Sequence, residues 1–549
     1  MIKPRPQLKP KRKSPSILFT LGGAIILIVG GGLAYWLLRH QSSSRALVRG
    51  TALVPESALV SLTMATDRNT WQQLSMFGTE ATATPWAEGI QNLGETLLQP
   101  QGLDFEAHIQ PWAERQMTLA ILPPTLATVE DLDTQATIWV VPIRNYNQAL
   151  TLLNNGTLTQ GQTTQTRTYE GVEIREFQSP DGTPAAIALL DQRWAVFTNE
   201  SASIDQVIDT LRGQPSVAQL PRFQAALGSI QGGSPFAEVY LNLPQASAQV
   251  ASNPERPVSP EALERLQNVQ GLAATLALDN QGLNIRTITW LKPNASETLT
   301  PKALSQSMAK YLPQDTLMMS SVGSFQQLWQ DYNRNVGTQL LLPFDPRQWR
   351  NNLLSSTGIN FDETFVEWMD SDFVGALVPS DAGQGAGLVL LAKATDRQAA
   401  EQAFQELDTA VRDRFNFQVS ESTLGDRTIT NWRVPPGLPV ASHGWLDNNI
   451  AFMTLGSPIA ERILTPESSL SQASLFQTAT RSELRTNSST LFIDVPRTLS
   501  LMQNSPFLPQ LAPSAMPYAE TIEAIGVTAA PNNAWSTRYN IRITLKQPS

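Results

Sequence analysis

Residues 102–123 read GLDFEAHIQPWAERQMTLAILP, and residues 358–379 read GINFDETFVEWMDSDFVGALVP. The two windows lie 256 residues apart and share five of their 22 positions. The identical pairs are Gly102/Gly358, Phe105/Phe361, Trp112/Trp368, Ala120/Ala376 and Pro123/Pro379. Average composition gives about one or two such matches by chance. We therefore interpret the chain as one module written twice, and expect the paired tryptophans to pack in the two cores.

The match extends over most of the chain, with small changes of offset that loop insertions would produce. The further pairs are Pro55–Leu59 with Pro313–Leu317, Asp191–Thr198 with Asp447–Thr454, Phe223 with Phe476, Leu241–Pro244 with Ile493–Pro496, and Leu291 with Leu545. A period this long is no solenoid repeat, and each unit is large enough to bury its own core. The sequence predicts repeat 1 at residues 53–292, a proline-flanked linker at 293–301 and repeat 2 at 302–549.

Strand-like runs follow one another, with helices interspersed irregularly, which is typical of an α+β fold with mostly antiparallel sheets. The predicted fold is therefore two tandem homologous domains of this class with packed helices, preceded by one N-terminal transmembrane helix. The clearest helix is residues 396–415, where apolar residues recur at helical spacing. Asp279–Gly282 is a turn signal inside the last strand-like run of repeat 1.

An uncharged apolar run at Ile17–Leu38 follows a basic tail, residues 1–16, and precedes a juxtamembrane linker, residues 39–52. The run is long enough to cross a bilayer as a helix. The positive-inside rule places the tail in the cytoplasm and the bulk of the chain outside it. A cleavable signal peptide is the alternative, although such peptides usually have a shorter apolar core. Gly30 and Ala34 form a small-xxx-small pair that favours a homodimer, or they reflect the frequency of small residues in membrane spans.

Charge divides at the predicted span. Residues 1–49 hold nine basic residues and no acidic ones, so the remaining 30 basic and 48 acidic residues give the outer part a net charge of −18. Such a surface repels phosphates, which argues against nucleic-acid partners. The chain has no cysteine, which excludes disulfides and thiolate sites.

Motifs for catalysis or for a cofactor are lacking, so the sequence predicts no catalytic residue and no cofactor. Besides His40 there are two histidines, His108 and His443, which lie opposite Thr364 and about Ala188 in the repeat alignment. Since neither is duplicated, we interpret both as surface or core residues rather than catalytic ones.

One acidic cluster is the candidate for a metal or catalytic site. It contains Asp362, Glu363, Glu367, Asp370 and Asp372. Glu363 and Glu367 would share one helical face and offer oxygens to a hard cation such as calcium. A solvated helix face on an acidic protein is the alternative, and repeat 1 lacks the dense cluster.

The basic tail, the single span, the Pro-x-x-(Ala/Thr)-Leu opening at Pro55–Leu59 and Pro313–Leu317, and the Gly-(Leu/Ile)-(Asp/Asn)-Phe motif resemble a cyanobacterial family of unknown function. Members of that family are single-span membrane proteins with a large, duplicated extracytoplasmic domain. The resemblance implies that the domains lie in the periplasm or the thylakoid lumen, and it carries no catalytic residues.

Three functions of different class fit the sequence. The first is a non-catalytic scaffold, assembly or interaction factor whose partners are membrane or envelope proteins. The second is a binding protein for a lipid, pigment or other apolar ligand, held between a curved sheet and its helices. The third is a hydrolase or metal-dependent enzyme that uses the Asp362–Asp372 acids. We rank them in that order.

Overall fold

A computed structural model describes residues 47–546 with gaps. The gaps are residues 67–107, 124–135, 160–161, 180–181, 233–234, 252–262, 264–266, 294–301, 305–306, 334–345, 381–384, 435–436, 448, 457, 483, 485 and 505–515. The predicted span Ile17–Leu38, with Gly30 and Ala34, lies outside the described residues. Among the helices that are described, none is both long and apolar enough to cross a bilayer.

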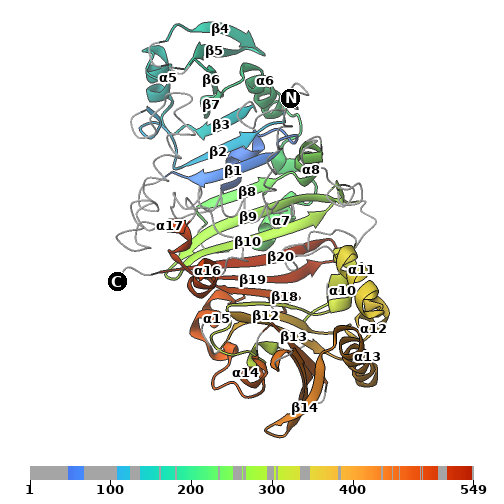
Figure 1. Ribbon diagram of the computed structural model, residues 1–549. Coiled ribbons are helices and arrows are strands. Elements are labelled where there is room, and N and C mark those ends of the chain that lie inside the picture. Colours follow the sequence, from blue (N-terminus) through green and yellow to red (C-terminus); the bar gives the residue numbers. More distant parts are fainter. Residues whose placement is uncertain are drawn as a thin grey trace, which may run out of the picture.

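The strands form a single antiparallel sheet that runs the length of the molecule (Figure 1). In the first half the strands are β1 (Val60–Ala65), β2 (Gln116–Ile121), β3 (Thr137–Pro142), β4 (Gln165–Tyr169), β5 (Val172–Gln178), β6 (Pro184–Leu190), β7 (Trp194–Thr198), β8 (Ala237–Leu241), β9 (Val269–Asp279) and β10 (Gly282–Leu291). Their spatial order is β4-β5-β6-β7-β3-β2-β1-β8-β9-β10.

The second half repeats this order with its own ten strands. They are β11 (Met318–Val322), β12 (Phe373–Pro379), β13 (Ala386–Lys393), β14 (Gln418–Leu424), β15 (Arg427–Val434), β16 (Leu438–Asp447), β17 (Ile450–Leu455), β18 (Ser489–Asp494), β19 (Ile522–Asn533) and β20 (Ser536–Leu545). Their order is β14-β15-β16-β17-β13-β12-β11-β18-β19-β20. Each strand of one half thus has a strand at the matching place in the other.

The two halves join through β10 and β20. These strands pair antiparallel over nine residue pairs, from Gly282↔Thr544 to Trp290↔Ser536. The prediction of an antiparallel α+β fold is confirmed. The sequence predicted mostly antiparallel sheets, and the described strands form a single sheet because backbone hydrogen bonds between β10 and β20 carry it through the junction.

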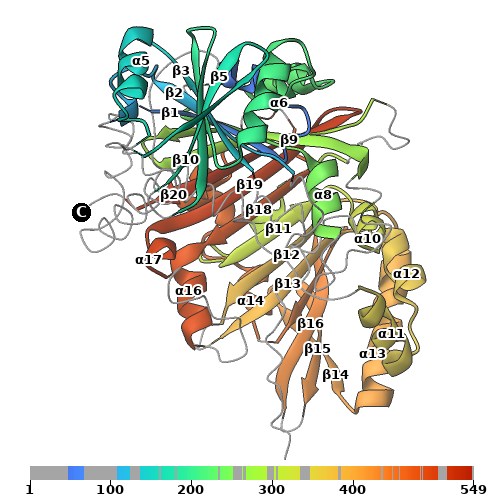
Figure 2. The ribbon, with the colours of Figure 1, turned by 90° about the horizontal axis from the view of Figure 1, so that it is seen from above.

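Helices cover both faces of the sheet. We call the face that carries Leu62 and Leu388 the front face, and the opposite one the back face. On the front lie α5 (Tyr146–Asn154), α8 (Leu243–Ala251), α10 (Phe325–Asn333), α11 (Pro346–Thr357), α12 (Phe361–Thr364) and α13 (Arg397–Phe415). On the back lie α6 (Ser201–Leu211), α7 (Phe223–Ile230), α14 (Ala460–Leu464) and α15 (Ser474–Ala479). Figure 2 shows α11, α12 and α13 together beside β14–β16.

Two short helices complete the second half, α16 (Val495–Asn504), which packs on β19, and α17 (Met516–Ala519). Four of the described 3-10 turns are η2 (Leu47–Ala52), η6 (Val217–Gln219), η7 (Met308–Tyr311) and η9 (Leu470–Gln472). A fifth, η8 (Val366–Trp368), directly follows α12.

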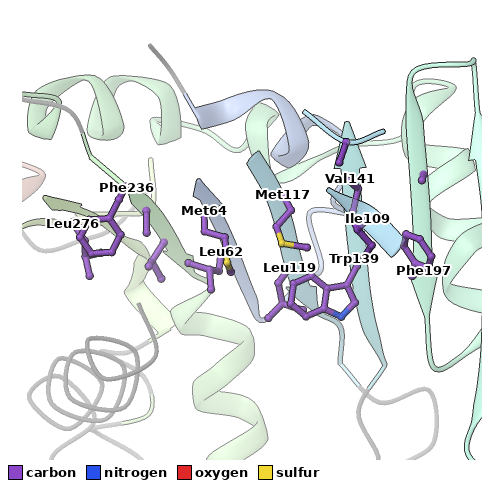
Figure 3. Packing of buried hydrophobic residues seen from close by; sticks show 14 of the residues in the cluster. Leu62, Met64, Ile109, Met117, Leu119, Trp139, Val141, Phe197, Phe236 and Leu276 are labelled. Atoms are coloured by element: carbon purple, nitrogen blue, oxygen red, sulfur yellow. The ribbon is translucent and has the colours of Figure 1, made fainter. Parts of the chain in front are cut away.

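The front core of the first half consists of large side chains in successive strands. Leu62, Leu119, Trp139 and Phe197 lie directly opposite one another across β1, β2, β3 and β7. All four are at least nine-tenths buried, and Figure 3 shows them packed in one layer. Burying a side chain of this size stabilises the fold by roughly 1.5–3 kcal/mol.

Equivalent polar contacts recur in both halves. The indole Nε1 of Trp112 donates to the backbone oxygen of His108 at 2.6 Å, and that of Trp368 donates to the backbone oxygen of Thr364 at 3.0 Å. Both tryptophans are buried, as predicted. Because the acceptor is a backbone oxygen, position 108 needs no particular side chain, which explains how His108 and Thr364 alternate there.

Equivalent contacts in loops and at helix caps also recur in both halves. Pro55 forms an isolated antiparallel β-bridge with Ser216, and Pro313 forms one with Ser469. Each of these serines begins a capping box with a glutamine three residues later. Asn242 accepts from the backbone N–H of Gln245, and Asp494 accepts from that of Arg497. Such side-chain caps satisfy backbone N–H groups that the helix leaves free.

Candidate ligand-binding face

A row of aliphatic side chains crosses the front face of the second half. Each member lies directly opposite the next on the neighbouring strand. The members of this aliphatic row are Ile543, Ile525, Ile493, Met318, Leu377, Leu388 and Leu455. Six of them are half-buried, and Leu388 is 39% exposed. Seven neighbouring strands place the ends of the row about 29 Å apart.

A second row beside it forms a shallow recess. Its members are Ser320, Gly375, Leu390, Met453 and His443, again paired strand to strand. A methyl group added to Gly375 would meet only one atom within 4 Å, a Leu390 methyl at 3.9 Å. No other described atom therefore fills the space above Gly375, and Leu390 and Met453 are half-buried beside it.

The matching positions of the first half are filled. By strand order and register, the first-half counterpart of Ser320 is Leu62, and that of Gly375 is Leu119. The counterpart of Leu390 is Trp139, and that of Met453 is Phe197. The first half thus carries large buried side chains at all four positions. The second half has two small residues, Ser320 and Gly375, beside the partly exposed Leu390 and Met453. A recess with an aliphatic floor is the result, and it is the chemistry that an apolar ligand needs.

The recess row ends at a buried polar cluster under α13. His443 Nε2 lies 2.8 Å from Asp408 Oδ1, and the indole Nε1 of Trp432 donates to the same oxygen at 2.6 Å. The His443 ring also stacks on Phe404, with centroids 4.5 Å apart. The first half has Ile187 at the matching register, and its helix α5 is only nine residues long against 19 for α13. The longer helix is what brings Asp408 over β16.

His443 was interpreted from sequence as a surface or core residue, and it is a buried core residue with a partner. His108 is half-buried beside Trp112, and its described role is the backbone contact to that indole. The two histidines lie in different halves and are not brought together. The Asp408 partnership was missed because the two residues are 35 positions apart.

The acidic cluster does not form one face of a helix. Helix α12 ends at Thr364, and a 3-10 turn, η8, carries Glu367. Glu363 and Glu367 are both exposed. Asp362 accepts hydrogen bonds from Trp329 Nε1 at 2.5 Å and from Arg350 Nη1 at 2.6 Å. Its carboxylate therefore holds α10 and α11 against α12.

Asp370 and Asp372, the other two acids of the cluster, make contacts that hold described segments together. Asp370 accepts from Ser324 Oγ at 2.7 Å and lies 3.3 Å from Lys302 Nζ. These two partners, the serine first, lower the pKa of Asp370 against a smaller opposing effect of burial. Asp372 is buried, and its backbone oxygen accepts from Lys393. Within the described ranges, no three His, Cys, Asp or Glu residues are placed to hold a metal ion. A metal at this cluster stays a prediction.

Glu238 is a titratable residue that sequence reasoning missed. It lies on β8 with its side chain on the back face, between Thr63 of β1 and Thr275 of β9. Burial raises its pKa to about 7. The signal was present in the sequence, as a lone acid inside the strand-like run Ala237–Leu241, but a charged residue in a strand usually points to solvent.

These features define an antiparallel α+β protein with two matched halves and an aliphatic recess in the second. The chain belongs to the family DUF3352, described as a protein of unknown function, which matches residues 20–545. That match begins inside the predicted span and covers the described structure almost completely.

The remaining comparisons add little. The search of curated proteins gives no match. Among solved structures, crystal form IV of TP0453 is similar at 11% identity and a TM-score of 0.25, covering 44% of this chain and 81% of that one. Crystal form I gives 9% identity and a TM-score of 0.26, with coverages of 46% and 81%. Similarity at this level carries no argument about fold or function.

Proposed function

We infer that the two halves arose by duplication of one module, related by a local two-fold axis through the β10–β20 junction. The repeated strand order and the repeated tryptophan and cap contacts support this. The sequence offset at the junction is 254 residues, from Leu291 and Leu545 (545 − 291). Arg286 pairs with Asn540, which is its own counterpart at that offset (286 + 254). A two-fold axis between these residues accounts for the register.

We propose that the protein is a non-catalytic binding protein for an apolar ligand with an extended aliphatic chain, such as the acyl chain of a lipid. The recess row of the second half carries this proposal, since Ser320 and Gly375 stand where the first half has two leucines. A ligand lying along the aliphatic row would cover side chains that are now partly exposed. Each methylene removed from water contributes about 0.8 kcal/mol, so ten would contribute about 8 kcal/mol before the entropy cost of binding.

The distribution of exposed apolar side chains agrees with this choice of face. Leu354, Leu388 and Phe415 are the large hydrophobic residues of the described chain that are exposed, and all three belong to the second half. Leu388 lies in the aliphatic row, whereas Leu354 lies on α11 and Phe415 on α13, two helices that pack on each other. The predicted anchor would hold this face close to a lipid source, outside the cytoplasm.

The test is crosslinking with a photoactivatable fatty acid, added to membranes that contain the full chain. We expect crosslinked peptides to map to β12, β13 and β17 after digestion and mass spectrometry. The variant Gly375→Leu fills the recess as Leu119 does in the first half, and should remove most of the crosslinks. Gly228→Leu is the matched control, because it adds the same atoms at an exposed helix position with nothing within 4 Å. Crosslinks that are absent, or that survive Gly375→Leu unchanged, would refute the proposal.

A scaffold for membrane or envelope proteins is the second candidate. The outermost strands β4 and β14 each pair with one neighbour among the described strands, which leaves one backbone edge of each available. Exposed edges can accept an extended segment of another protein. Crosslinking in membranes that recovers a reproducible protein partner through residues 165–169 or 418–424 would favour this function. Recovery of none would leave lipid binding as the better account.

A further inference from the structure

A hollow whose lining includes several polar and charged side chains opens at the junction of the two halves, away from the aliphatic recess. Its volume is about 660 Å³, within the range of small-molecule sites. The walls come from the β9–β10 turn, from α15, from the start of α16 and from the ends of β18, β19 and β20. The lining residues that matter for its chemistry are Gln281, Ser474, Thr478, Glu523, Thr544 and Lys546.

The counterpart of this hollow in the other half is closed. At the offset of 254 residues, Thr544 corresponds to Trp290 and Gln281 corresponds to Trp535. Trp290 is fully buried against Phe223 and Tyr240. Arg222 lies over the Trp535 ring at 4.7 Å and donates to the backbone oxygen of Leu291 at 2.9 Å. Two tryptophans and an arginine therefore occupy the space that the second half leaves open.

The floor of the hollow contains an unused hydrogen-bonding group. Thr544 is 5% exposed, lines the hollow, and its Oγ1 has no partner among the described residues. A buried hydroxyl without a partner is costly, so a ligand that bonded to this one would remove that cost. Ser474 and Thr478 on α15 add two further hydroxyls on the wall.

The charges of the hollow come in opposite signs. Asp494 and Arg497 pair with each other at 3.0 Å and so neutralise one another. Glu523 and Lys546 also line the hollow, and neither forms an ion pair with another described residue. A carboxylate and an ammonium group left unpaired in one polar hollow complement a ligand that carries both charges itself.

We propose that this hollow binds a small zwitterion of the amino-acid or short-peptide class. Glu523 receives the ammonium group of the ligand and Lys546 receives its carboxylate. Thr544 and the two hydroxyls of α15 take the remaining polar atoms. The closed counterpart explains why the described part of the chain has this hollow in one half and not in the other.

The experiment is calorimetric titration of the purified full chain with alanyl-alanine, with glucose as the neutral comparison. We expect saturable binding of the dipeptide, no binding of glucose, and a loss of affinity of at least tenfold in Glu523→Gln and in Lys546→Met. Thr544→Trp copies the closed half and should abolish binding. If Thr544→Trp fails to fold by circular dichroism, the two charge variants decide the matter.

Glu467→Gln is the matched control, since Glu467 is exposed and does not line the hollow. Its affinity for the dipeptide should equal that of the unchanged protein. The proposal is overturned if alanyl-alanine does not bind, if glucose binds as well as the dipeptide, or if Glu523→Gln binds it with unchanged affinity.

Discussion

Replacing Glu238 by glutamine should make the protein more stable in alkaline solution and leave it unchanged in acid. The Glu238 side chain is 7% exposed, and its neighbours across β1 and β9 are Thr63 and Thr275. No charge compensates the carboxylate there, so burial alone raises its pKa from 4.5 to about 7. Glutamine has nearly the same shape and cannot ionise.

The magnitude follows from the shift. A carboxyl group whose pKa is raised in the folded state holds its proton more tightly there than in the unfolded chain. Its ionisation therefore leaves the unfolding free energy unchanged below pH 4.5 and lowers it progressively as the pH rises from 4.5 to 7. Above pH 7 the loss of unfolding free energy is constant. A difference of about 2.5 pKa units corresponds to about 3 kcal/mol of unfolding free energy.

The assay is urea unfolding of the full chain at pH 4, 5.5, 7 and 8.5, compared with the Glu238→Gln variant. Other titrating groups cancel in the comparison, so the difference between the two curves isolates Glu238. Glu467→Gln, an exposed acid, serves as the control and should run parallel to the unchanged protein. The reasoning is refuted if Glu238→Gln also runs parallel to it over the whole range.

Other substitutions probe the matched contacts and the junction. Trp112→Phe and Trp368→Phe each leave a buried backbone oxygen without its indole donor, and should each lower the unfolding free energy by about 1–3 kcal/mol in denaturant titrations. Asp408→Ala should cost at least roughly 2 kcal/mol, with Asp408→Asn costing less because it keeps an acceptor, as followed by tryptophan fluorescence during unfolding. Arg542→Met removes the ion pair with Asp279 that ties β20 to the β9–β10 turn, and should lower the thermal midpoint by an amount equivalent to about 1–2 kcal/mol. If any of these variants unfolds with unchanged stability, the contact that it removes makes no net contribution to the stability of the fold.

Much of the local structure follows from sequence patterns. The helix predicted at 396–415 begins at Arg397 with Asp396 as its cap, because a short acid that accepts a backbone N–H favours that position. The turn signal at Asp279–Gly282 does separate β9 from β10, and Gly282 adopts a φ of +139° that other residues avoid. Strand β4 was missed because its residues are polar on both sides, as an edge strand allows.

The junction and the sites could not be predicted in the same way. The pairing of β10 with β20 joins residues far apart in the sequence, and no local pattern specifies which sheet edges meet. The recess depends on Gly375 and Ser320, which are unremarkable in sequence and gain meaning only beside Leu119 and Leu62. The density of acidic residues at 362–372 predicted a shared site, whereas in the structure Asp362 binds Arg350 and Asp370 binds Ser324.

The β10–β20 junction also sets the order in which the chain can finish folding. Strand β10 is complete some 250 residues before β20 leaves the ribosome, since Leu291 and Leu545 mark their ends. During that interval the first half exposes a backbone edge ten residues long, and such edges pair readily with other chains. Strand β20, the last one described, is therefore what protects the first half, so truncation within β20 should cause aggregation of a half whose own residues are intact.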